Sequence, residues 1–533
     1  MAQQTIKVPS LGRVEGDLDV KVTIKDGVVV DAWTEATMFR GFEKILVGKD
    51  PQAGLIMTPR ICGICGGSHL TKSAYALDTA FHTEVPPNAT LVRNIAQAVE
   101  TIQSIPRWFY ALFAIGLTHK NYQSSSLYEE VNRRWAPFVG ENYEKGVTIS
   151  AKPVEVYAIF GGQWPHSSFM IPGGVMCAPT LSDITRSISI LDYFRTNWLE
   201  KILLGCSMER WLENKTWSDV LEWLEEKEEH YESDLGLFIR YSQDIGLDKY
   251  GAGPGKYLAA GSFPNPEKYI HPTIESRNSA LIARSGVYDG ENFYDFDQAR
   301  IREDHTHSFY EGTGSYHPFE GFTNPLDPEE GVKQGKYTFA KAPRYALDSG
   351  ETPLEVGPLA RQVIAGREGA EDWQDYDPLI YNIVKEIGPS IMVRVLARLH
   401  EAPKYFRHVQ RWLKQIDLHE KFYVNPGELI EGRGFGATEA ARGFLADWIQ
   451  VKDGKIEKYQ IITPTAWNIG PRDRFGQRGP IETALIGTPI KNPEDPVELA
   501  HIAQSYDSCL VCTVHAYDGK TNKQLAKYRV TNF

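Results

Sequence analysis

Two cysteine pairs at opposite ends of the chain have the spacing of metal ligands. Cys62 and Cys65 form the first pair, and Cys509 and Cys512 form the second. Two residues between cysteines make a tight turn that points both sulfurs the same way, so that each pair can hold one ion. Together the pairs supply the four sulfurs of a tetrahedral site. We therefore expect the fold to bring both ends of this 533-residue chain together around one metal ion.

Other interpretations of these cysteines stay open when spacing alone is considered. A single CxxC pair also occurs in structural zinc sites and in redox pairs, although structural zinc sites usually keep both pairs within one small module. Six cysteines in a chain of 60.1 kDa are too few for a disulfide framework, and this favours a reducing compartment. Cys177 and Cys206 have no CxxC neighbour and are predicted to be small buried apolar residues.

The residues around both pairs extend them into longer motifs. The first reads Arg60-x-Cys62-Gly63-x-Cys65-x-x-x-His69, and the second reads Asp507-x-Cys509-x-x-Cys512-x-x-His515. These motifs resemble the two signatures of the large subunit of nickel-iron hydrogenases. Further segments resemble the same family in the same order, namely 12–17, 38–43, 355–361, 434–443 and 464–468. The resemblance therefore runs through most of the chain.

The resemblance implies a metal centre and a reaction. Cys62, Cys65, Cys509 and Cys512 would hold nickel, and Cys65 and Cys512 would bridge to an iron that carries one CO and two cyanide ligands, Fe(CN)2(CO). Thiolates suit soft metals and can bridge two of them. Such a centre splits H2 heterolytically, and we expect this chain to work in the uptake direction. Because no cysteine pair is left for iron–sulfur clusters, we expect an iron–sulfur small subunit as the electron-accepting partner.

The resemblance also assigns roles to residues near the metals. Arg472 would place its guanidinium above the open nickel–iron position, and Asp507 would hold that arginine. The alternative is an arginine that merely pairs with an acid. His69 would donate to a bridging sulfur and tune its basicity, unless it is a core histidine bonded to backbone. The residues expected around the cofactor are Pro464, Thr465, Pro471, Arg472 and His69.

Two further sites are expected from the same resemblance. Glu15 would accept a proton from the Cys509 sulfur, since a carboxyl near thiolates and away from water favours its protonated form; the alternative is a pair with Arg13. Glu43, His515 and the backbone carbonyl near Ile490 would bind a structural Mg²⁺ together with water. Residues 516–533 follow the last motif, and we expect them to be removed on maturation.

Composition limits the partners. The chain has 57 Lys and Arg against 69 Asp and Glu, a net charge of −12, which argues against nucleic acid as a ligand. No apolar run is long enough for a membrane span, and the N-terminus has no signal-peptide pattern. We expect a cytoplasmic protein, free or attached to a membrane through partners, that assembles as a higher-order oligomer of heterodimers. Among this family the pattern is most similar to the cytoplasmic uptake group.

Two rival functions remain. The first is a hydrogen-sensing regulatory subunit, which would use the same metal site to signal rather than to turn over H2. The second is the homologous quinone-reductase subunit of respiratory complex I, a metal-free protein. The four cysteines weigh against the second rival, because that subunit lacks them.

The elements that must position these residues are predicted to form one large α+β domain, mainly helical, over residues 1–533. Apolar residues alternate from Leu18 to Ile24 before Asp26-Gly27, which predicts a β-hairpin. A second hairpin is expected at 448–462, around Asp453-Gly454. Helical periodicity marks 91–102, 184–198 with Ser182 as N-cap, and 392–413. We expect long helices in a bundle, edged by small sheets.

Overall fold

The computed structural model describes residues 3–509 apart from residues 10, 12, 15 and 17. The first cysteine pair is therefore fully described, and the second is described at Cys509 alone. The predictions on Glu15, Cys512, His515 and the extension 516–533 lie outside the described residues. The C-terminal boundary of the predicted single domain stays a prediction for the same reason.

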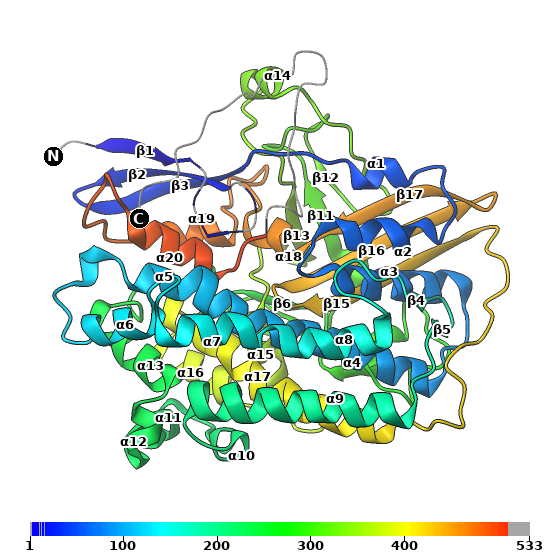
Figure 1. The fold of residues 1–533 in the computed structure, drawn as a ribbon. Helices are drawn as coiled ribbons and strands as arrows, with labels where there is room; N and C mark the ends of the chain where they lie inside the picture. Colours follow the sequence, from blue (N-terminus) through cyan, green and yellow to red (C-terminus); the bar gives the residue numbers. More distant parts are fainter. Residues whose placement is uncertain (1–2, 10, 12, 15, 17, 510–533) are drawn as a thin grey trace.

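Long helices form the centre of the molecule (Figure 1). The helices α4 (Pro87–Trp108) and α17 (Ile391–Gln415) pack against each other, and α8 (Ala151–Gly161) covers α4 and contacts α9 (Leu181–Phe194). The predicted helices 91–102 and 392–413 are thus present and longer than expected. The helix predicted at 184–198 begins earlier, because Thr180 and not Ser182 is its N-cap and forms a capping box with Asp183. It continues after Phe194 as a π-helical segment, Arg195–Leu204.

Small antiparallel sheets lie at the edge of this bundle. The strands β1 (Gln4–Val8), β2 (Leu18–Lys25) and β3 (Val28–Ala36) form one sheet, with the predicted turn at Asp26-Gly27. The strands β15 (Gly432–Ala440), β16 (Gly443–Lys452) and β17 (Lys455–Ile462) form another, with the predicted turn at Asp453-Gly454. Both predicted hairpins are present. The fold is α+β and mainly helical, as the sequence predicts.

Further α-helices and strands complete the fold. The other helices are α1 (Phe42–Leu46), α2 (Ala53–Met57), α3 (Gly66–Phe81), α5 (Ala114–Leu117), α6 (Tyr128–Trp135), α7 (Glu141–Ile149), α10 (Met208–Trp211), α11 (Trp217–Glu226), α12 (Glu228–Tyr231), α13 (Asp234–Ile245), α14 (Pro328–Lys333), α15 (Pro358–Ala365), α16 (Leu379–Ile387), α18 (Pro464–Asn468), α19 (Pro480–Leu485) and α20 (Val497–Ser505). The other strands are β4 (Met170–Ile171), β5 (Gly174–Val175), β6 (Tyr257–Ala259), β7 (Ser262–Pro264), β8 (Leu281–Ala283), β9 (Gly286–Tyr288), β10 (Phe293–Tyr294), β11 (Ile301–Asp304), β12 (Ser315–Tyr316), β13 (Ala342–Leu347) and β14 (Gly350–Thr352).

Cys62 and Cys65, the N-terminal half of the cysteine cluster, lie just before helix α3, and the sheet β15–β17 supports that helix. The sheet packs directly on α3, and the two approach so closely that a Cβ on Gly436 would lie 2.1 Å from the carbonyl oxygen of Lys72. At this contact only glycine fits, so the backbones of helix and strand meet without an intervening side chain.

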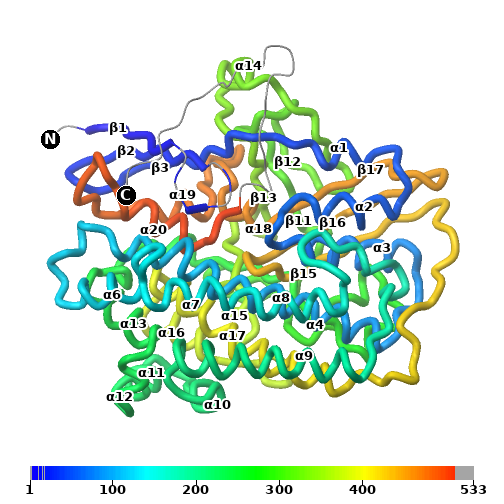
Figure 2. The backbone as a smooth tube through the Cα atoms, viewed as in Figure 1, coloured from blue at the N-terminus to red at the C-terminus, as the bar shows by residue number. Residues whose placement is uncertain are grey.

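Cys509, the C-terminal half of the cysteine cluster, lies in the segment that follows α20. This segment runs to the middle of the molecule (Figures 1 and 2). One continuous cluster of buried apolar side chains extends from Leu11 to Tyr506 and so joins both ends of the described chain. Within the part of the chain that the structure describes, no helix combines the length and the apolar character needed to cross a bilayer.

Candidate metal centre

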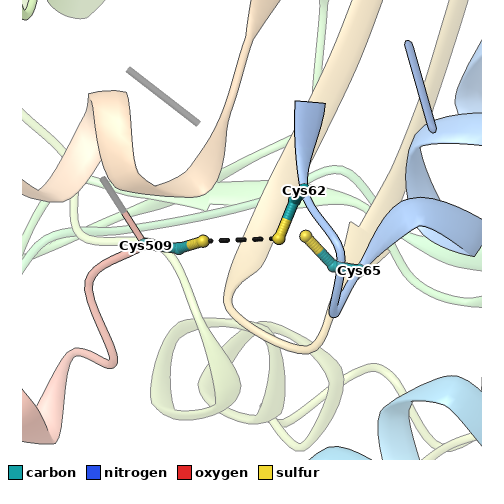
Figure 3. A group of neighbouring side chains, drawn as sticks. All are labelled: Cys62, Cys65 and Cys509. Carbon is teal, nitrogen blue, oxygen red and sulfur yellow. Dashed lines mark hydrogen bonds between the residues drawn. The ribbon is translucent and has the colours of Figure 1, made fainter. Parts of the chain in front are cut away.

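The structure brings together three of the four predicted sulfur ligands. The sulfur atoms of Cys62, Cys65 and Cys509 all lie within 4.8 Å of one another (Figure 3). Cys62 Sγ and Cys509 Sγ are 3.5 Å apart, although 447 residues separate them in the sequence. All three cysteines are buried and none forms a disulfide. Buried thiols gathered in this way have the geometry of a soft-metal site.

Backbone geometry shapes the N-terminal half of the cluster. A short 3-10 helix, Thr58–Ile61, ends at Cys62, and Cys65 is the N-cap residue of α3. The guanidinium of Arg40 donates to the carbonyl oxygens of Ile61 (2.6 Å) and Arg60 (2.9 Å), directly before Cys62. Helix, 3-10 turn and arginine together fix the loop that carries both sulfurs.

A tight turn after α20 delivers the C-terminal sulfur. Asp507 has a left-handed backbone, with φ of 51°, which is unusual for a residue with a side chain. Its N–H donates to the carbonyl of Gln504 (2.9 Å), and the N–H of Cys509 donates to Thr465 Oγ1 (2.9 Å). Thr465 and Pro464 begin α18 and are buried beside Cys509, where the sequence predicted the cofactor pocket.

Arg442 is the cationic side chain beside the sulfurs, and the sequence analysis missed it. It lies on the turn between β15 and β16, donates from Nε to the carbonyl oxygen of Asp507 (2.9 Å) and from Nη2 to Asp507 Oδ1 (3.1 Å). Burial alone would lower the pKa of Arg442, but the negative charges of Asp507, Cys509, Cys65 and Cys62 raise it well above its ordinary value. The available signal was the family motif at 434–443, which contains this arginine.

The prediction for Arg472 needs a correction, because Asp507 does not hold it. The guanidinium of Arg472 pairs with Asp31, donates to the carbonyl of Ala32 (3.1 Å) and lies over the ring of Trp33. The side chain is 20% exposed. The Arg472 side chain therefore packs against strand β3 rather than beside the cysteine cluster.

The loop that carries Arg472 is tied down by another buried arginine. Arg344 donates from Nη2 to the carbonyl of Pro471 (2.9 Å) and from Nε to Asp473 Oδ2 (2.7 Å). Arg344 and Asp473 are both fully buried. Pro471, predicted to line the cofactor pocket, is held by this pair, and the loop directs Arg472 toward β3.

A second arginine shares the carboxylate of Asp507. Arg398 Nη1 lies 2.5 Å from Asp507 Oδ2, and Arg398 Nη2 donates to Ser104 Oγ (2.7 Å). Burial lowers the pKa of Arg398 to about 10, since the nearby charge of Asp507 compensates only in part and Arg442 opposes it. Two guanidinium groups on one carboxylate leave an excess positive charge next to the thiols, and a cation favours the thiolate form.

His69 lies on α3, one turn after Cys65. It is buried, and its backbone carbonyl accepts from Thr58 Oγ1 (3.1 Å). Burial and the nearby cation of Lys72 lower the pKa of His69 well below its ordinary value, while Cys62 acts in the opposite sense. The ring is therefore neutral and carries one N–H. Its predicted bond to a bridging sulfur stays a prediction.

Glu43 lies away from Ile490, so this part of the predicted Mg²⁺ site is wrong. The N–H of Ile490 donates to the carbonyl of Gly27 (2.8 Å) at the β2–β3 turn, whereas Glu43 follows the opposite end of β3. Nine residues of strand place these ends roughly 25 Å apart, and Figure 1 shows the α19–α20 loop and α1 on opposite sides. The backbone next to Glu43 is that of Ile461, whose N–H donates to Glu43 Oε1 (2.9 Å).

Glu43 is part of a buried charged cluster. Its carboxylate accepts from the hydroxyl of Thr323 and lies 3.5 Å from Lys341 Nζ. Lys341 also lies 3.2 Å from Glu303 Oε2. Two carboxylates against one lysine give this cluster an excess of negative charge.

The cysteine cluster has the donors and the surroundings that a metal centre with polar ligands requires. The donors are soft, buried and convergent, as nickel and iron require. Beside them Arg442 Nη1 is buried without a hydrogen-bond partner among the described residues. An unpaired buried donor of this kind calls for an acceptor, such as a ligand of a metal in the cluster.

Comparisons with known proteins agree with this geometry. A sequence model of the nickel-dependent hydrogenase family matches residues 40–119 and 115–515. The large subunit of the periplasmic [NiFeSe] hydrogenase of Desulfomicrobium baculatum is 32% identical over 542 residues, which cover 97% of this chain and 96% of that protein. The uptake hydrogenase large subunit of Bradyrhizobium diazoefficiens is 28% identical over 610 residues, covering 98% and 97%.

Solved structures show the same architecture. The reduced, active form of the Ni-Fe-Se hydrogenase from Desulfomicrobium baculatum matches with a TM-score of 0.80 and 31% identity, over 96% of this chain and 100% of that chain. The Ni-Fe-Se hydrogenase from D. vulgaris Hildenborough in the reduced state matches with a TM-score of 0.78 and 30% identity, again over 96% and 100%.

Proposed function

Because this chain belongs to the nickel-dependent hydrogenase family and is an oxidoreductase that acts on H2, we propose that it oxidises H2 in the uptake direction. It would be the catalytic large subunit and would pass electrons to an iron–sulfur small subunit. The convergence of Cys62, Cys65 and Cys509 is the observation that carries this proposal. The family implies a nickel-iron active site, and these thiols are the donors such a site needs.

We propose that Cys62, Cys65, Cys509 and Cys512 hold the nickel and that the iron carries one CO and two cyanides. When bound, this centre supplies the redox-active metals on which H2 is cleaved into two protons and two electrons. The chain supplies the surroundings. Burial keeps water from the thiols, and Pro464 and Thr465 line the side of Cys509.

Charged residues of the chain set the electrostatics of the centre. Arg442 and Arg398 offset the negative charge of the thiolates, and Asp507 fixes both guanidinium groups in place. A fixed cation in a buried site stabilises negative charge more strongly than the same cation in water. The Cys509 thiolate would accept a proton and pass it to Glu15, which lies outside the described residues.

We further propose a structural Mg²⁺ at Glu43 and His515, with Ile461 as the neighbouring backbone. The excess negative charge of Glu43 and Glu303 around Lys341 supports a cation here. The Mg²⁺ would tie the C-terminal motif to α1. Protein purified with a chelator and then assayed for magnesium and for thermal unfolding tests this site.

We propose that this chain assembles with a small subunit. The relatives are named large subunits, which supports a small-subunit partner. We also propose a cytoplasmic location and a higher-order oligomer of heterodimers, as the sequence predicts. Large subunit purified without a partner should show no H2-dependent dye reduction, and full turnover by this chain alone would disprove the need for a partner.

Maturation is proposed to remove residues 516–533. The intact mass of the active enzyme decides this point, because active protein that retains the extension would contradict cleavage. The rival function, a hydrogen sensor, is separated by turnover: a sensor would oxidise H2 far more slowly than an uptake enzyme.

One experiment tests the central proposal. The purified complex is analysed for nickel and iron, and its infrared spectrum is recorded for the stretching bands of CO and cyanide. We expect nickel, iron and both kinds of band, together with H2-dependent reduction of a dye. Zinc in place of nickel, with no diatomic bands, would disprove the function.

A further inference from the structure

A stripe of polar residues leads away from the metal centre along a buried helix. Glu498, His501 and Gln504 recur at every third position of α20, and Asp507 follows at the same interval beside Cys509. Residues three apart are neighbours on a helix surface. All four side chains are at most 3% exposed. A fully buried helix is normally apolar on every side, so this stripe requires an explanation.

The middle of the stripe holds polar atoms that the protein leaves unpaired. Neither ring nitrogen of His501 has a hydrogen-bond partner among the described residues. The ring of His501 lies 5.7 Å from that of Tyr122 and 5.7 Å from that of Phe113. Buried polar groups of this kind are usually bridged by ordered water. The stripe therefore has the chemistry of a hydrated path.

Gly116 on α5 leaves space for this path. A Cβ at that position would lie 2.6 Å from His501 Cε1 and 3.3 Å from Arg13 Nη1, so any side chain would close the gap between them. Arg13 and His119 are the charged groups that act on His501. The ring of Tyr122 contacts His501, and Glu498 in turn acts on Tyr122. Burial, then Arg13 and His119, lower the pKa of His501 to about 3, so its ring is neutral.

The outer end of the stripe reaches the surface. His119 Nε2 lies 3.0 Å from Asp495 Oδ2, and these two side chains are 22% and 42% exposed. Glu498 lies three residues before His501 on α20, within electrostatic reach of Lys491 and His119, and burial raises the pKa of its carboxyl. A carboxyl with a raised pKa holds a proton more readily than a carboxyl in water, as a relay group must.

The inner end of the stripe joins the metal centre. The carbonyl oxygen of Gln504 accepts from the N–H of Asp507 (2.9 Å) and from Trp108 Nε1 (3.2 Å). Asp507 in turn holds Arg442, and Cys509 follows two residues later. The helix thus spans the distance between a buried sulfur cluster and an exposed histidine–aspartate pair.

We propose that protons leave the metal centre through ordered water along this stripe and are relayed by His501 and Glu498 to the surface pair His119–Asp495. The inference rests on the proposed function and names the outer part of its proton path. A neutral imidazole suits a relay, because an N–H bond forms on one ring nitrogen as the N–H bond on the other breaks. The ring has no net charge before or after, and its rotation restores the starting tautomer.

The test uses the complete enzyme with His501→Phe, which keeps a buried ring but cannot carry a proton. We expect its rate of H2-dependent dye reduction to fall roughly 10- to 100-fold, in the lower range of what a positioned proton-transfer group contributes. The solvent deuterium isotope effect on that rate should rise, since proton transfer becomes rate-limiting. Nickel content and the CO and cyanide bands should match those of the wild type, which separates a lost relay from a damaged centre.

A matched control is available in the same chain. His305 is equally buried, its pKa is lowered to about 3, chiefly by burial, and neither ring nitrogen has a hydrogen-bond partner among the described residues. Its ring neighbours are Tyr310, Tyr316 and Phe322, and the cations of Lys341 and Lys336 lie nearby. His305→Phe should leave the rate and the isotope effect unchanged.

Wild-type turnover with an unchanged isotope effect in a fully metallated His501→Phe enzyme would overturn the proposal. Should that variant lose its metals, Glu498→Gln replaces it, because the amide keeps the shape of the carboxyl but cannot pass the proton on. Unchanged turnover in Glu498→Gln would then overturn the proposal. Failure of the proposed function looks different, since the wild-type enzyme itself would lack the diatomic bands and H2 oxidation.

Discussion

The two halves of the cysteine cluster are held by different kinds of structure. Cys62 and Cys65 lie where a 3-10 turn meets α3, and the sheet β15–β17 packs tightly on that helix. Cys509 follows a left-handed turn that is held by side chains, chiefly by Arg442 and Arg398 on Asp507. The first half is thus a rigid frame built from backbone. The second half depends on a few buried charges.

This difference suits a site that closes around metals. A frame made of helix and sheet can exist before the metal binds, because its hydrogen bonds are local. A turn held by buried ion pairs is stable only when every partner is in place, since a lone buried charge is costly. We therefore expect the C-terminal half to be the more sensitive to substitution, and the following predictions test that contrast.

Loss of a sulfur should have the largest effect, and it should be equal in both halves. Cys62→Ser and Cys509→Ser each remove a soft donor, so nickel content and H2 oxidation should fall to the level of metal-free protein. Metal analysis and dye reduction measure this. Cys206→Ser, which lies outside the cluster, should keep both. A Cys509→Ser enzyme with full nickel and activity would contradict the site.

Arg442→Lys should come next, with turnover lowered about 10²- to 10³-fold, the usual result of removing one fixed electrostatic group. Lysine keeps the charge but loses the fork that binds both the carbonyl and the carboxylate of Asp507. The matched control is Arg472→Lys, at a side chain that packs against β3, and it should stay near the wild-type rate. A larger loss of turnover in Arg472→Lys than in Arg442→Lys would show that Arg472, and not Arg442, acts at the metal centre.

Arg398→Met should lower the free energy of unfolding by about 3 kcal/mol, because it removes one partner of a buried ion pair. Arg40→Met, in the N-terminal half, should cost less, about 2 kcal/mol, because it removes hydrogen bonds to two neutral carbonyl groups. Denaturant titrations of both variants compare the halves directly. A larger loss for Arg40→Met would reverse the proposed contrast.

Thr465→Val should have the smallest effect. It leaves the buried N–H of Cys509 without its acceptor, which costs about 1–2 kcal/mol of stability. Nickel should still bind, because no donor sulfur is lost. Thermal unfolding and nickel content check this, and Thr338→Val, at a second buried hydroxyl that accepts from the N–H groups of Ala36 and Ala340, provides a comparison.

The sequence predicted those features that depend on local pattern. The hairpins at Asp26-Gly27 and Asp453-Gly454 follow from turn chemistry, and the long helix at 391–415 follows from apolar periodicity. The N-cap of α9 was misplaced by two residues, because Thr180 and Ser182 both have capping hydroxyls and only Thr180 meets Asp183 in a capping box.

The errors in the site share one cause, which is that motif order does not measure distance in space. Arg472 lies in a motif just after the cofactor pocket, but the buried pair Arg344–Asp473 turns its loop toward β3. Ile490 is close to the last motif in sequence, but β3 separates it from Glu43.

The sequence by itself predicted the ligand chemistry from four cysteines in two CxxC pairs, with the family motifs around them. Spacing within three or four residues is enough for that, because a short turn has few conformations. Only the tertiary structure decided which arginine neutralises the thiolates and which backbone meets Glu43. Those partners come from strands and loops far apart in the chain, and their meeting depends on how helix α3, the sheet β15–β17 and α20 pack together.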